Sequence, residues 1–411
     1  MSALTTPAAD SIAVTGLGVI SAAGLDAQTT WKAVASAQPT ARNCPALEGL
    51  ATDLACEVED FDATARLGAN FTRRTDRFTQ LAMIAGAEAL RAARLDPATW
   101  DGARVGVVIG TAFGGVTTLN DQAVRAHQGH AVSPVTVPAV LANMAAGLLS
   151  LEWHAHGPSL AVATACASGA TAIGLAADLL RADRCDVVIA GGAEAPVNRL
   201  VAAAFARMDA LSLNRGRPVE ASRPFDVERD GFVLAEGAGM LVLERASDAA
   251  ARRAPALARL AGFGASADAH HFTSPHPGGY GLELAVTQAL RGAGAQPADV
   301  DHVNAHATST PKGDLAEAAL LHRLFAGDVS VTAPKGVLGH TLGAAGAIEA
   351  AMTVLSIAEQ TAPPTANLNE PDPRIELDIV AGEARPQAIR LALSNSCGFG
   401  GQNAVLAFTP A

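Results

Sequence analysis

Aromatic residues are scarce in this chain of 411 residues, at 4% of the sequence, although hydrophobic residues make up 49%. Few large rings are available to fill a core, so we expect helices and strands to pack through close backbone contact at Gly and Ala. A chain this long and this apolar forms two or three domain-sized units around a large core. Its composition excludes a disordered or fibrous protein.

Basic residues are also in the minority, and the formal net charge is −11. Nucleic-acid binding requires clustered Lys and Arg against phosphates, so we expect no nucleic-acid partner. Charges interrupt every apolar run before the ~18 residues that a membrane span needs, so we expect no span. The first ten residues, MSALTTPAAD, lack the basic and apolar regions of a secretory signal, so we expect no secretion.

Cysteines are few, odd in number and irregularly spaced. This pattern matches neither a disulfide framework nor a zinc motif. We therefore expect free thiols in a reducing, cytoplasmic environment and no metal site. The five cysteines are Cys44, Cys56, Cys166, Cys185 and Cys397.

Strand-like and helix-like segments alternate along the whole chain, which predicts an α/β fold. The expected strands are residues 11–15, 105–109, 160–164, 187–190, 240–244, 257–263, 300–305, 329–333, 391–395 and 404–408. The expected helices are residues 79–95, 167–182, 282–293 and 314–325. In the second of these helices, Ile173, Ala176, Ala177 and Leu180 recur at helical spacing and form one apolar stripe.

The chain contains two internal sequence repeats. The segment ALRAARLDP, which begins at Ala89, is matched by ALRGAGAQP, which begins at Ala289. In the second repeat, SLAVATACASGATAIGLAADLL matches VSVTAPKGVLGHTLGAAGAIEAAM, and each segment is a strand, a small-residue turn and a helix. Both repeats occur in the same order, which predicts two homologous halves, residues 1–250 and 251–411, joined near residues 249–256.

Cys166 lies in VATACASGATAIG, where an apolar run meets small residues that open a helix. A thiol there would face the positive end of the helix dipole, which stabilises a thiolate. Sulfur also suits acyl transfer, because it is both a strong nucleophile and a competent leaving group. The alternative at this point is a small buried hydrophobic residue, the usual role of a free cysteine.

Two histidines stand in unusual surroundings. His306 follows a predicted strand in VNAHATSTPKGD, and His340 precedes a Gly/Ala-rich helix in APKGVLGHTLGAAGA. Neutral imidazoles can donate hydrogen bonds to a thioester carbonyl and stabilise an enolate. The spacing of His302 and His306 could indicate a metal, but no further ligand cluster completes such a site.

Lys335 precedes His340, and Glu349 follows it on the predicted helix. A buried Lys–Glu pair there could tune the histidines, while a solvated ion pair is the equally open alternative. Further on, GFGG around Phe399 predicts a tight turn between two strands. Such a turn can present a backbone N–H group to an oxyanion, although an ordinary hairpin turn has the same pattern.

Taken together, these segments resemble the β-ketoacyl-acyl-carrier-protein synthases of the thiolase superfamily, especially the elongating ketosynthases of dissociated (type II) systems. They appear in family order and span nearly the whole chain. The matching segments are TACASG, RPFDVERDGFVLAEGAGMLVLE, NAHATSTPKGD, PKGVLGHTLGAAGAIE and NSCGFGGQN.

The resemblance implies a five-layered αβαβα thiolase fold and a ping-pong Claisen condensation. Cys166 would take an acyl group from the phosphopantetheine arm of an acyl carrier protein, and the enzyme would need no cofactor of its own. A malonyl-carrier protein would then lose CO₂, with His306 and His340 stabilising the enolate. The backbone N–H groups of Cys166 and Phe399 would hold the tetrahedral oxyanion.

The resemblance also assigns supporting residues. Lys335 and Glu349 fall on the family's ion pair, and Phe399 on its gating phenylalanine. Thr308 and Thr310 match threonines that contact the pantetheine arm. Asp314 matches a structural acid beside the histidine loop.

Two residues depart from the family pattern at the site. Phe113 stands where the resemblance places the floor of the acyl pocket, often a smaller aliphatic residue. We therefore predict that Phe113 shortens or redirects the pocket. Cys397 stands where Phe is common, which leaves a spare thiol behind Phe399.

The carrier-docking surface departs as well. Many fatty-acid synthases have basic residues at the positions of His130 and Ala131. Without them, the remaining candidates for docking a carrier protein are Arg73, Arg74 and Arg77.

The assembly and the precise activity stay open at this point. The chain could form a homodimer in fatty-acid synthesis, or be the catalytic subunit of a type II polyketide or polyene ketosynthase paired with a cysteine-free chain-length factor. A non-catalytic chain-length factor or scaffold would need neither Cys166 nor the two histidines. A degradative thiolase would use a second catalytic cysteine near the position of Cys397, but the pair of histidines favours the decarboxylating branch.

Overall fold

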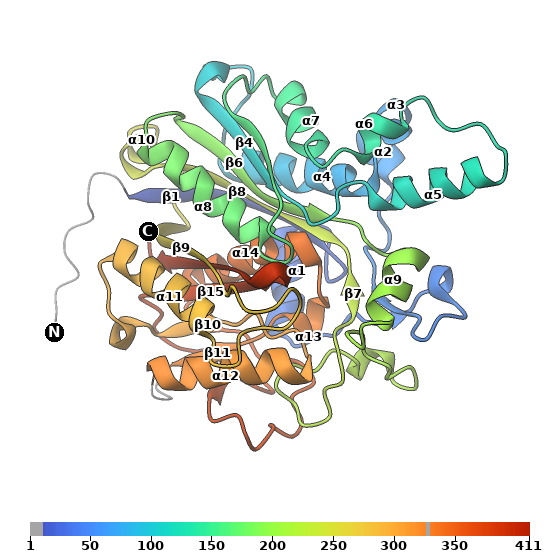
Figure 1. Ribbon diagram of the computed structural model, residues 1–411. Coiled ribbons are helices and arrows are strands. Elements are labelled where there is room, and N and C mark those ends of the chain that lie inside the picture. Colours follow the sequence, from blue (N-terminus) through green and yellow to red (C-terminus); the bar gives the residue numbers. More distant parts are fainter. Residues whose placement is uncertain (1–10, 326–328) are drawn as a thin grey trace.

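The computed structural model describes residues 11–325 and 329–411 (Figure 1). The segment MSALTTPAAD, in which we expect no secretory signal, lies outside these residues. Within the described ranges, no helix combines the length and apolarity needed to cross a membrane.

One mixed sheet forms the centre of the molecule, with strand order β13-β11-β10-β15-β16-β9-β1-β8-β6-β4-β5. Its strands are β1 (Ile12–Ser21), β4 (Val105–Gly110), β5 (Ser159–Val162), β6 (Val187–Glu194), β8 (Gly237–Arg245), β9 (Ala258–Ala267), β10 (His302–Asn304), β11 (Ser330–Thr332), β13 (Asp378–Ile379), β15 (Ala392–Gly398) and β16 (Gln402–Thr409). Two small sheets hold β2 (Arg42–Asn43), β3 (Leu54–Cys56) and β7 (Leu234–Ala235), and β12 (Thr361–Ala362) with β14 (Arg385–Pro386).

The helices cover the sheet in layers. They are α1 (Ala27–Ala35), α2 (Ala63–Leu67), α3 (Ala69–Thr72), α4 (Arg77–Ala92), α5 (Val116–His127), α6 (Thr136–Val140), α7 (Met144–Glu152), α8 (Ser168–Arg181), α9 (Arg199–Ala206), α10 (Ala246–Ala251), α11 (Tyr280–Ala293), α12 (Pro311–Phe325), α13 (Lys335–Leu338) and α14 (Ala345–Ala358). Short 3₁₀ turns are η1 (Pro45–Leu47), η2 (Gly102–Arg104), η3 (Pro218–Glu220), η4 (Pro297–Asp299), η5 (Leu342–Ala344) and η6 (Phe399–Gly401).

The same strand pattern occurs twice in the large sheet. From β1 outward, β8 and β6 pair antiparallel, and β4 and β5 then pair parallel. From β9 outward, β16 and β15 pair antiparallel, and β10 and β11 then pair parallel. Strands β1 and β9 join the two half-sheets antiparallel. The topology therefore confirms the predicted α/β fold with two related halves.

Three apolar layers separate the helices from the strands. The middle core contains α8 and α14, which pack on each other between the half-sheets (Figure 1). The predicted stripe of α8, which includes Ile173 and Leu180, is buried in this core. Helices α4 and α7 cover the outer face of the first half, and α11 and α12 cover that of the second. The order of layers is αβαβα, as the resemblance implied.

Glycines allow two strands to lie directly on a helix backbone, as the composition predicts. A Cβ atom on Gly18 of β1 would lie 1.8 Å from the carbonyl oxygen of Ala85 in α4. A Cβ atom on Gly264 of β9 would lie 1.9 Å from the carbonyl oxygen of Ala285 in α11. Since any larger side chain would push the helix away, these two contacts fix the same layer spacing in both halves.

Every predicted strand and helix overlaps an observed one, but several bounds differ. The strand expected to end at residue 15 continues to Ser21, because Gly16 and Gly18 fit against α4 instead of ending the strand. Helix α4 begins two residues early, where the Asp76 side chain accepts a hydrogen bond from the Phe78 N–H and caps it. Helices α1, α5, α7 and α9 were not predicted; none of the residues of α5 is buried, so it has no apolar stripe facing a core.

Candidate active site

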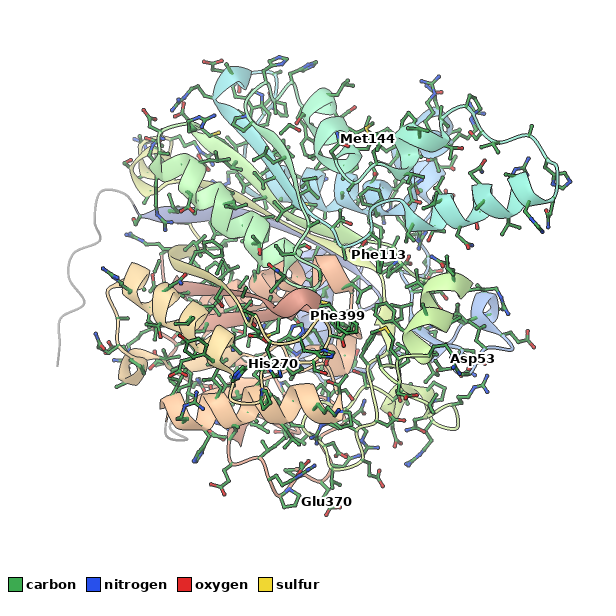
Figure 2. The ribbon with its side chains drawn as sticks, viewed as in Figure 1. Asp53, Phe113, Met144, His270, Glu370 and Phe399 are labelled. Atoms are coloured by element: carbon green, nitrogen blue, oxygen red, sulfur yellow. The ribbon has the colours of Figure 1, made fainter. Side chains whose placement is uncertain are left out.

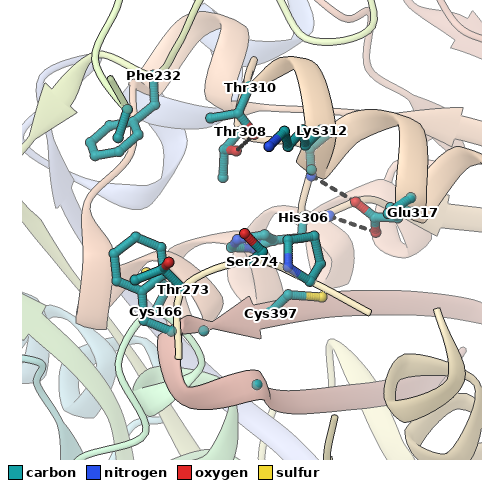
Figure 3. A pocket seen from close by; sticks show the side chains of 18 of the residues that line it. Cys166, Phe232, Thr273, Ser274, His306, Thr308, Thr310, Lys312, Glu317 and Cys397 are labelled. Atoms are coloured by element: carbon teal, nitrogen blue, oxygen red, sulfur yellow. Dashed lines mark hydrogen bonds between the residues drawn. The ribbon is translucent and has the colours of Figure 1, made fainter. Parts of the chain in front are cut away.

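The predicted site residues meet at a cavity of about 450 Å³ between the two halves. Cys166, His306, His340 and Phe399 all line it. Figure 3 shows Cys166 and His306 facing this cavity. Cys166 precedes α8 of the first half, whereas the other three belong to loops of the second half. Residues far apart in sequence are thus brought together because α8 and α14 pack side by side at the centre.

A strained turn presents the Cys166 thiol to this cavity. Ala165 has a left-handed φ of 49°, which is uncommon for a residue with a side chain. The Ser168 hydroxyl holds the turn, because it accepts a hydrogen bond from the Thr164 N–H and donates one to the Ala165 carbonyl. The backbone N–H groups of Phe399 and of Cys166 itself lie close enough to the sulfur to lower its pKa. These are the two N–H groups to which the resemblance assigns the oxyanion.

The thiol is not the stabilised thiolate that the sequence suggested. Burial raises the pKa of Cys166 to about 12, and the charge of Glu194 also raises it. The positive charge of Lys335 and the backbone N–H groups lower it without offsetting burial. Burial therefore outweighs the helix-dipole effect that the sequence suggested, since Cys166 is only 9% exposed.

His306 and His340 form an edge-to-face pair with ring centroids 5.4 Å apart. Burial lowers the pKa of both imidazoles well below the usual value, and the charge of Lys335 lowers them further. Both rings are therefore neutral at pH 7. Lys335 Nζ lies 3.4 Å from His306 Nδ1, which can only accept from an ammonium, so His306 carries its proton on Nε2.

Lys335 and Glu349 form a buried ion pair behind the histidines. Their side chains are 1% and 2% exposed, so the solvated ion pair left open by the sequence is ruled out. Burial raises the pKa of Glu349 to about 7, although Lys335 opposes this shift. Burial and the nearby ammonium of Lys335 together lower the pKa of both imidazoles.

Two acids on the first turns of α12 support the histidine loop, and only Asp314 was predicted. Asp314 is buried and accepts a hydrogen bond from the Phe225 N–H, and burial raises its pKa to about 7. Glu317, one turn later, accepts hydrogen bonds from the N–H groups of His306 and Ala307 (Figure 3). The i, i+3 spacing of the two acids was the signal that could have identified Glu317.

Threonines and a further loop form the entrance. Thr308 and Thr310 line the cavity with their hydroxyls 3.0 Å apart. A loop between β9 and α11, residues 268–279, also borders the cavity and was not predicted. It is bound to the GFGG turn, because the Gly400 N–H donates to the Phe272 carbonyl and the Asp268 N–H donates to the Gly401 carbonyl. Its lack of regular periodicity left no signal in the sequence.

The predicted pocket floor, Phe113, does not line the cavity. Its side chain is 44% exposed, and its ring lies 6.5 Å from that of Phe205. Phe205 does line the cavity and also lies 6.2 Å from the ring of Phe399. In Figure 2, Phe113 and Phe399 both lie near the middle of the molecule. The missed residue Phe205 therefore stands between Phe113 and the cavity.

The comparisons with known proteins decide the family. The sequence profile of the beta-ketoacyl synthase N-terminal domain matches residues 9–249, and that of the C-terminal domain matches residues 257–369. The chain belongs to the β-ketoacyl synthase family. It is 40% identical to a 3-oxoacyl-[acyl-carrier-protein] synthase 2 of Synechocystis over 97% of each chain.

Solved structures of ketosynthases share the whole fold. The ishigamide ketosynthase/chain length factor superposes with a TM-score of 0.92 at 31% identity, covering 98% of this chain and 99% of that one. A β-ketoacyl synthase from Burkholderia phymatum gives a TM-score of 0.92 at 32% identity, with the same coverage. This ketosynthase is therefore an acyltransferase with a thiolase-like fold.

The remaining thiol of the ketosynthase cavity, Cys397, points its sulfur away from Cys166 (Figure 3). Burial raises its pKa well above the usual value, and the charge of Glu317 raises it further. His302, the candidate partner of His306 at a metal site, instead lies within 2.8 Å of the Ser330 hydroxyl. No group of three potential metal ligands occurs in the part of the chain that the structure describes.

The candidate docking arginines differ in their availability. Arg73 and Arg74 are exposed. Arg77 instead forms an ion pair with Glu236 through two hydrogen bonds, so its guanidinium is not free for a carrier protein. The prediction is corrected for Arg77 and stays a prediction for the other two.

Proposed function

We propose that this ketosynthase condenses an acyl group held on Cys166 with a malonyl unit delivered by an acyl carrier protein. The convergence of Cys166, two neutral histidines and two backbone N–H groups on one cavity carries this proposal. The thiol suits acyl transfer, and the histidine pair suits stabilisation of an enolate.

In the first half-reaction, the Cys166 sulfur attacks the carbonyl carbon of an acyl-pantetheine thioester. The thiol loses its proton as the S–C bond forms, the carbonyl bond to the pantetheine sulfur breaks, and that sulfur takes up the proton. The N–H groups of Cys166 and Phe399 hold the oxyanion between these events. Removal of one such donor typically costs on the order of 10²–10³ in rate.

In the second half-reaction, a malonyl thioester enters and its C–C bond to the carboxylate breaks, releasing CO₂. The electron pair moves to the thioester oxygen, where the Nε2–H of His306 and a proton of His340 donate hydrogen bonds. The enolate carbon then attacks the acyl-Cys166 carbonyl and releases the thiolate of Cys166. Lys335 keeps His306 in the donating tautomer.

The substrates travel on phosphopantetheine, which belongs to the carrier protein. Thr308 and Thr310 line the entrance and offer hydroxyls to the amides of the arm. Lys312 lies beside them at the mouth of the cavity. We propose that Arg73 and Arg74 contribute charge to the carrier-docking surface.

A partner subunit is proposed at the edge strand β5. This strand ends the large sheet and leaves Leu160 42% exposed. Leu151 of α7 and Leu175 of α8, which both pack on β5, are also exposed. An apolar sheet edge of this kind favours pairing with another chain. We propose a second copy as the partner.

A chain-length-factor homologue is the alternative partner, and the similarity to the ishigamide ketosynthase/chain length factor favours it. In that case the protein would be the catalytic subunit of a polyketide or polyene system. Cross-linking or co-purification from the native host distinguishes a homodimer from a complex with a cysteine-free homologue.

We also propose that the chain divides functionally into residues 1–250, which carry Cys166, and 251–411, which carry His306, His340 and Lys335. A degradative thiolase would need a second thiol directed at the first. The orientation of Cys397 away from Cys166 supports the decarboxylating reaction instead.

The proposal is tested by the intact mass of the protein after incubation with acyl-carrier proteins of graded chain length. We expect an acyl adduct on the wild-type protein and none on Cys166→Ala. An adduct that persists in the variant would show that another residue is the nucleophile.

A further inference from the structure

A buried carboxylate, Glu194, lies beside the cavity and takes no part in the steps above. It is the last residue of β6 and has no exposed surface. Its two oxygens accept four hydrogen bonds, from the Thr111 hydroxyl at 2.9 Å and from the N–H groups of Ala112, Phe113 and Gly343. A carboxylate with four neutral donors is a fixed junction, since each unsatisfied donor would cost free energy in the core.

This junction links loops from the two halves. Residues 111–113 follow β4 of the first half, whereas Gly343 follows His340 in the second half. The fit is close, because a Cβ atom on Gly343 would lie 2.3 Å from the Ala112 nitrogen. The neighbouring Leu342 has a left-handed φ of 47° and lines the cavity. Glu194 therefore holds the loop of Phe113 against the segment that forms part of the cavity wall.

Glu194 also acts on the nucleophile through its charge. The charge of Glu194 raises the pKa of Cys166, whereas that of Lys335 lowers it. Burial raises the pKa of Glu194 itself to about 7, against the effect of its hydrogen bonds. A thiolate on Cys166 and a carboxylate on Glu194 therefore oppose each other.

We propose that Glu194 is a positioning residue for acyl transfer: it ties residues 111–113 of the first half to Gly343 and so holds the neighbouring Leu342 in its place in the cavity wall. This inference rests on the proposed acylation of Cys166. Cys166 is a neutral thiol before acylation, and it becomes a neutral thioester when the sulfur gains the acyl carbon and the pantetheine sulfur takes the proton. The charge of Glu194 therefore acts only on the thiolate that forms during the transfer.

The charge is tested in the full-length protein by the rate at which iodoacetamide alkylates Cys166, followed by intact mass from about pH 6 to about pH 9. Glu194→Gln removes the charge, so we expect the variant to react faster than wild type at high pH. Each unit by which the thiol pKa falls raises the rate about tenfold. The ratio of the two rates should approach one at the acid end, where Glu194 is protonated in the wild type.

Glu88→Gln is the matched control. Glu88 also accepts two backbone N–H groups, from Val19 and Ala27, and burial raises its pKa too, but its charge is not among those that shift the pKa of Cys166. We expect its alkylation profile to match the wild type. If the ratio of the Glu194→Gln alkylation rate to the wild-type rate were the same at every pH, the change would reflect a structural defect and overturn the proposed charge effect.

The positioning effect is tested separately with Thr111→Val, which keeps the charge but removes one hydrogen bond to Glu194 and the acceptor of the Gly114 N–H. We expect a several-fold change in the relative loading of short and long acyl chains, with a wild-type pH profile of alkylation. An unchanged chain-length preference in both Thr111→Val and Glu194→Gln would overturn the positioning role. Because alkylation needs no carrier protein, failure of the proposed function appears separately, as a wild-type protein that accepts no acyl group.

Discussion

The first half of the molecule holds β1 against α4 through glycines, and the second half holds β9 against α11 in the same way. The strand pattern is also the same in both. The loops at the centre differ: the first half contributes a thiol before α8, and the second contributes two imidazoles and an ion pair around α14. The scaffold is repeated, while the residues to which we assign the chemistry are divided between its copies.

In both halves, burial keeps the reactive side chains uncharged. Burial raises the pKa of the Cys166 thiol and lowers the pKa of His306 and His340, so all three are uncharged at rest. The buried charges nearby belong to the residues that support them, such as the Lys335–Glu349 pair behind the histidines. Uncharged reacting groups suit chemistry in which charge appears on the reacting thioester.

Loss of either histidine should impair only the decarboxylation step, which we assign to the second half. We expect His306→Ala or His340→Ala to lower decarboxylation of malonyl-carrier protein by on the order of 10²–10³, because a donor to the enolate oxygen is lost. Release of labelled CO₂ measures this rate. Acyl loading of Cys166, measured by mass in the same samples, should change only a few-fold; equal loss of both reactions would contradict the division.

Removal of the Lys335 ammonium in the second half should affect stability as well as activity. Lys335→Ala leaves Glu349 buried without its partner, which typically costs about 3–5 kcal/mol of unfolding free energy. Urea denaturation measures this change. Arg77→Ala in the first half is the comparison: Arg77 is 35% exposed, so water can solvate part of the site and the cost should be smaller. Equal costs would contradict the account of the buried pair.

The glycines provide a test of the repeated scaffold. Gly18→Ala and Gly264→Ala each place a Cβ atom against a helix carbonyl and should destabilise the protein by about 1–3 kcal/mol. The two shifts in urea midpoint should be similar. Gly147→Ala, in an open position on α7, should leave the midpoint close to wild type or raise it. A large effect in only one half would show that the two contacts are not equivalent.

The pH dependence of Cys166 alkylation tests whether its thiol is uncharged at neutral pH, as the two imidazoles are. With the pKa of Cys166 raised to about 12, the thiolate fraction rises with pH up to that value. We expect alkylation by iodoacetamide to accelerate about tenfold per unit between about pH 8 and about pH 10. A plateau that begins below this range would indicate the low-pKa thiolate that the helix dipole first suggested.

The smallest effect should come from Phe113 in the first half. Phe113→Ala should change acyl-chain preference only a few-fold, because Phe205 separates Phe113 from the cavity. Phe205→Ala should change it more. Loading of Cys166 with acyl chains of graded length measures both preferences; no change with Phe113→Ala would rule out its predicted role in the pocket.

The sequence predicts the fold and the central residues of the site well, for physical reasons. Buried strands and helices such as β4 and α8 leave apolar runs or stripes that can be read locally. Cys166, His306 and His340 could be found because each stands beside small residues at the end of an element. Their convergence follows from the resemblance and the internal repeat, since no local pattern specifies it.

Other features depend on distant contacts and leave no local pattern. Glu194 and Glu317 look like ordinary acids in the sequence, yet each receives backbone N–H groups from other segments. The protonation of Cys166 depends on how far the second half closes the cavity over it. The position of Phe205 between Phe113 and the cavity is likewise set by packing between loops.

The most direct test of the division of chemistry is to measure both half-reactions of Cys166→Ala beside those of wild type. The account predicts that the variant forms no acyl adduct but still releases CO₂ from malonyl-carrier protein within a few-fold of wild type. Loss of decarboxylation together with acylation in a folded variant would contradict it, because the histidine pair would then depend on the thiol for its own step.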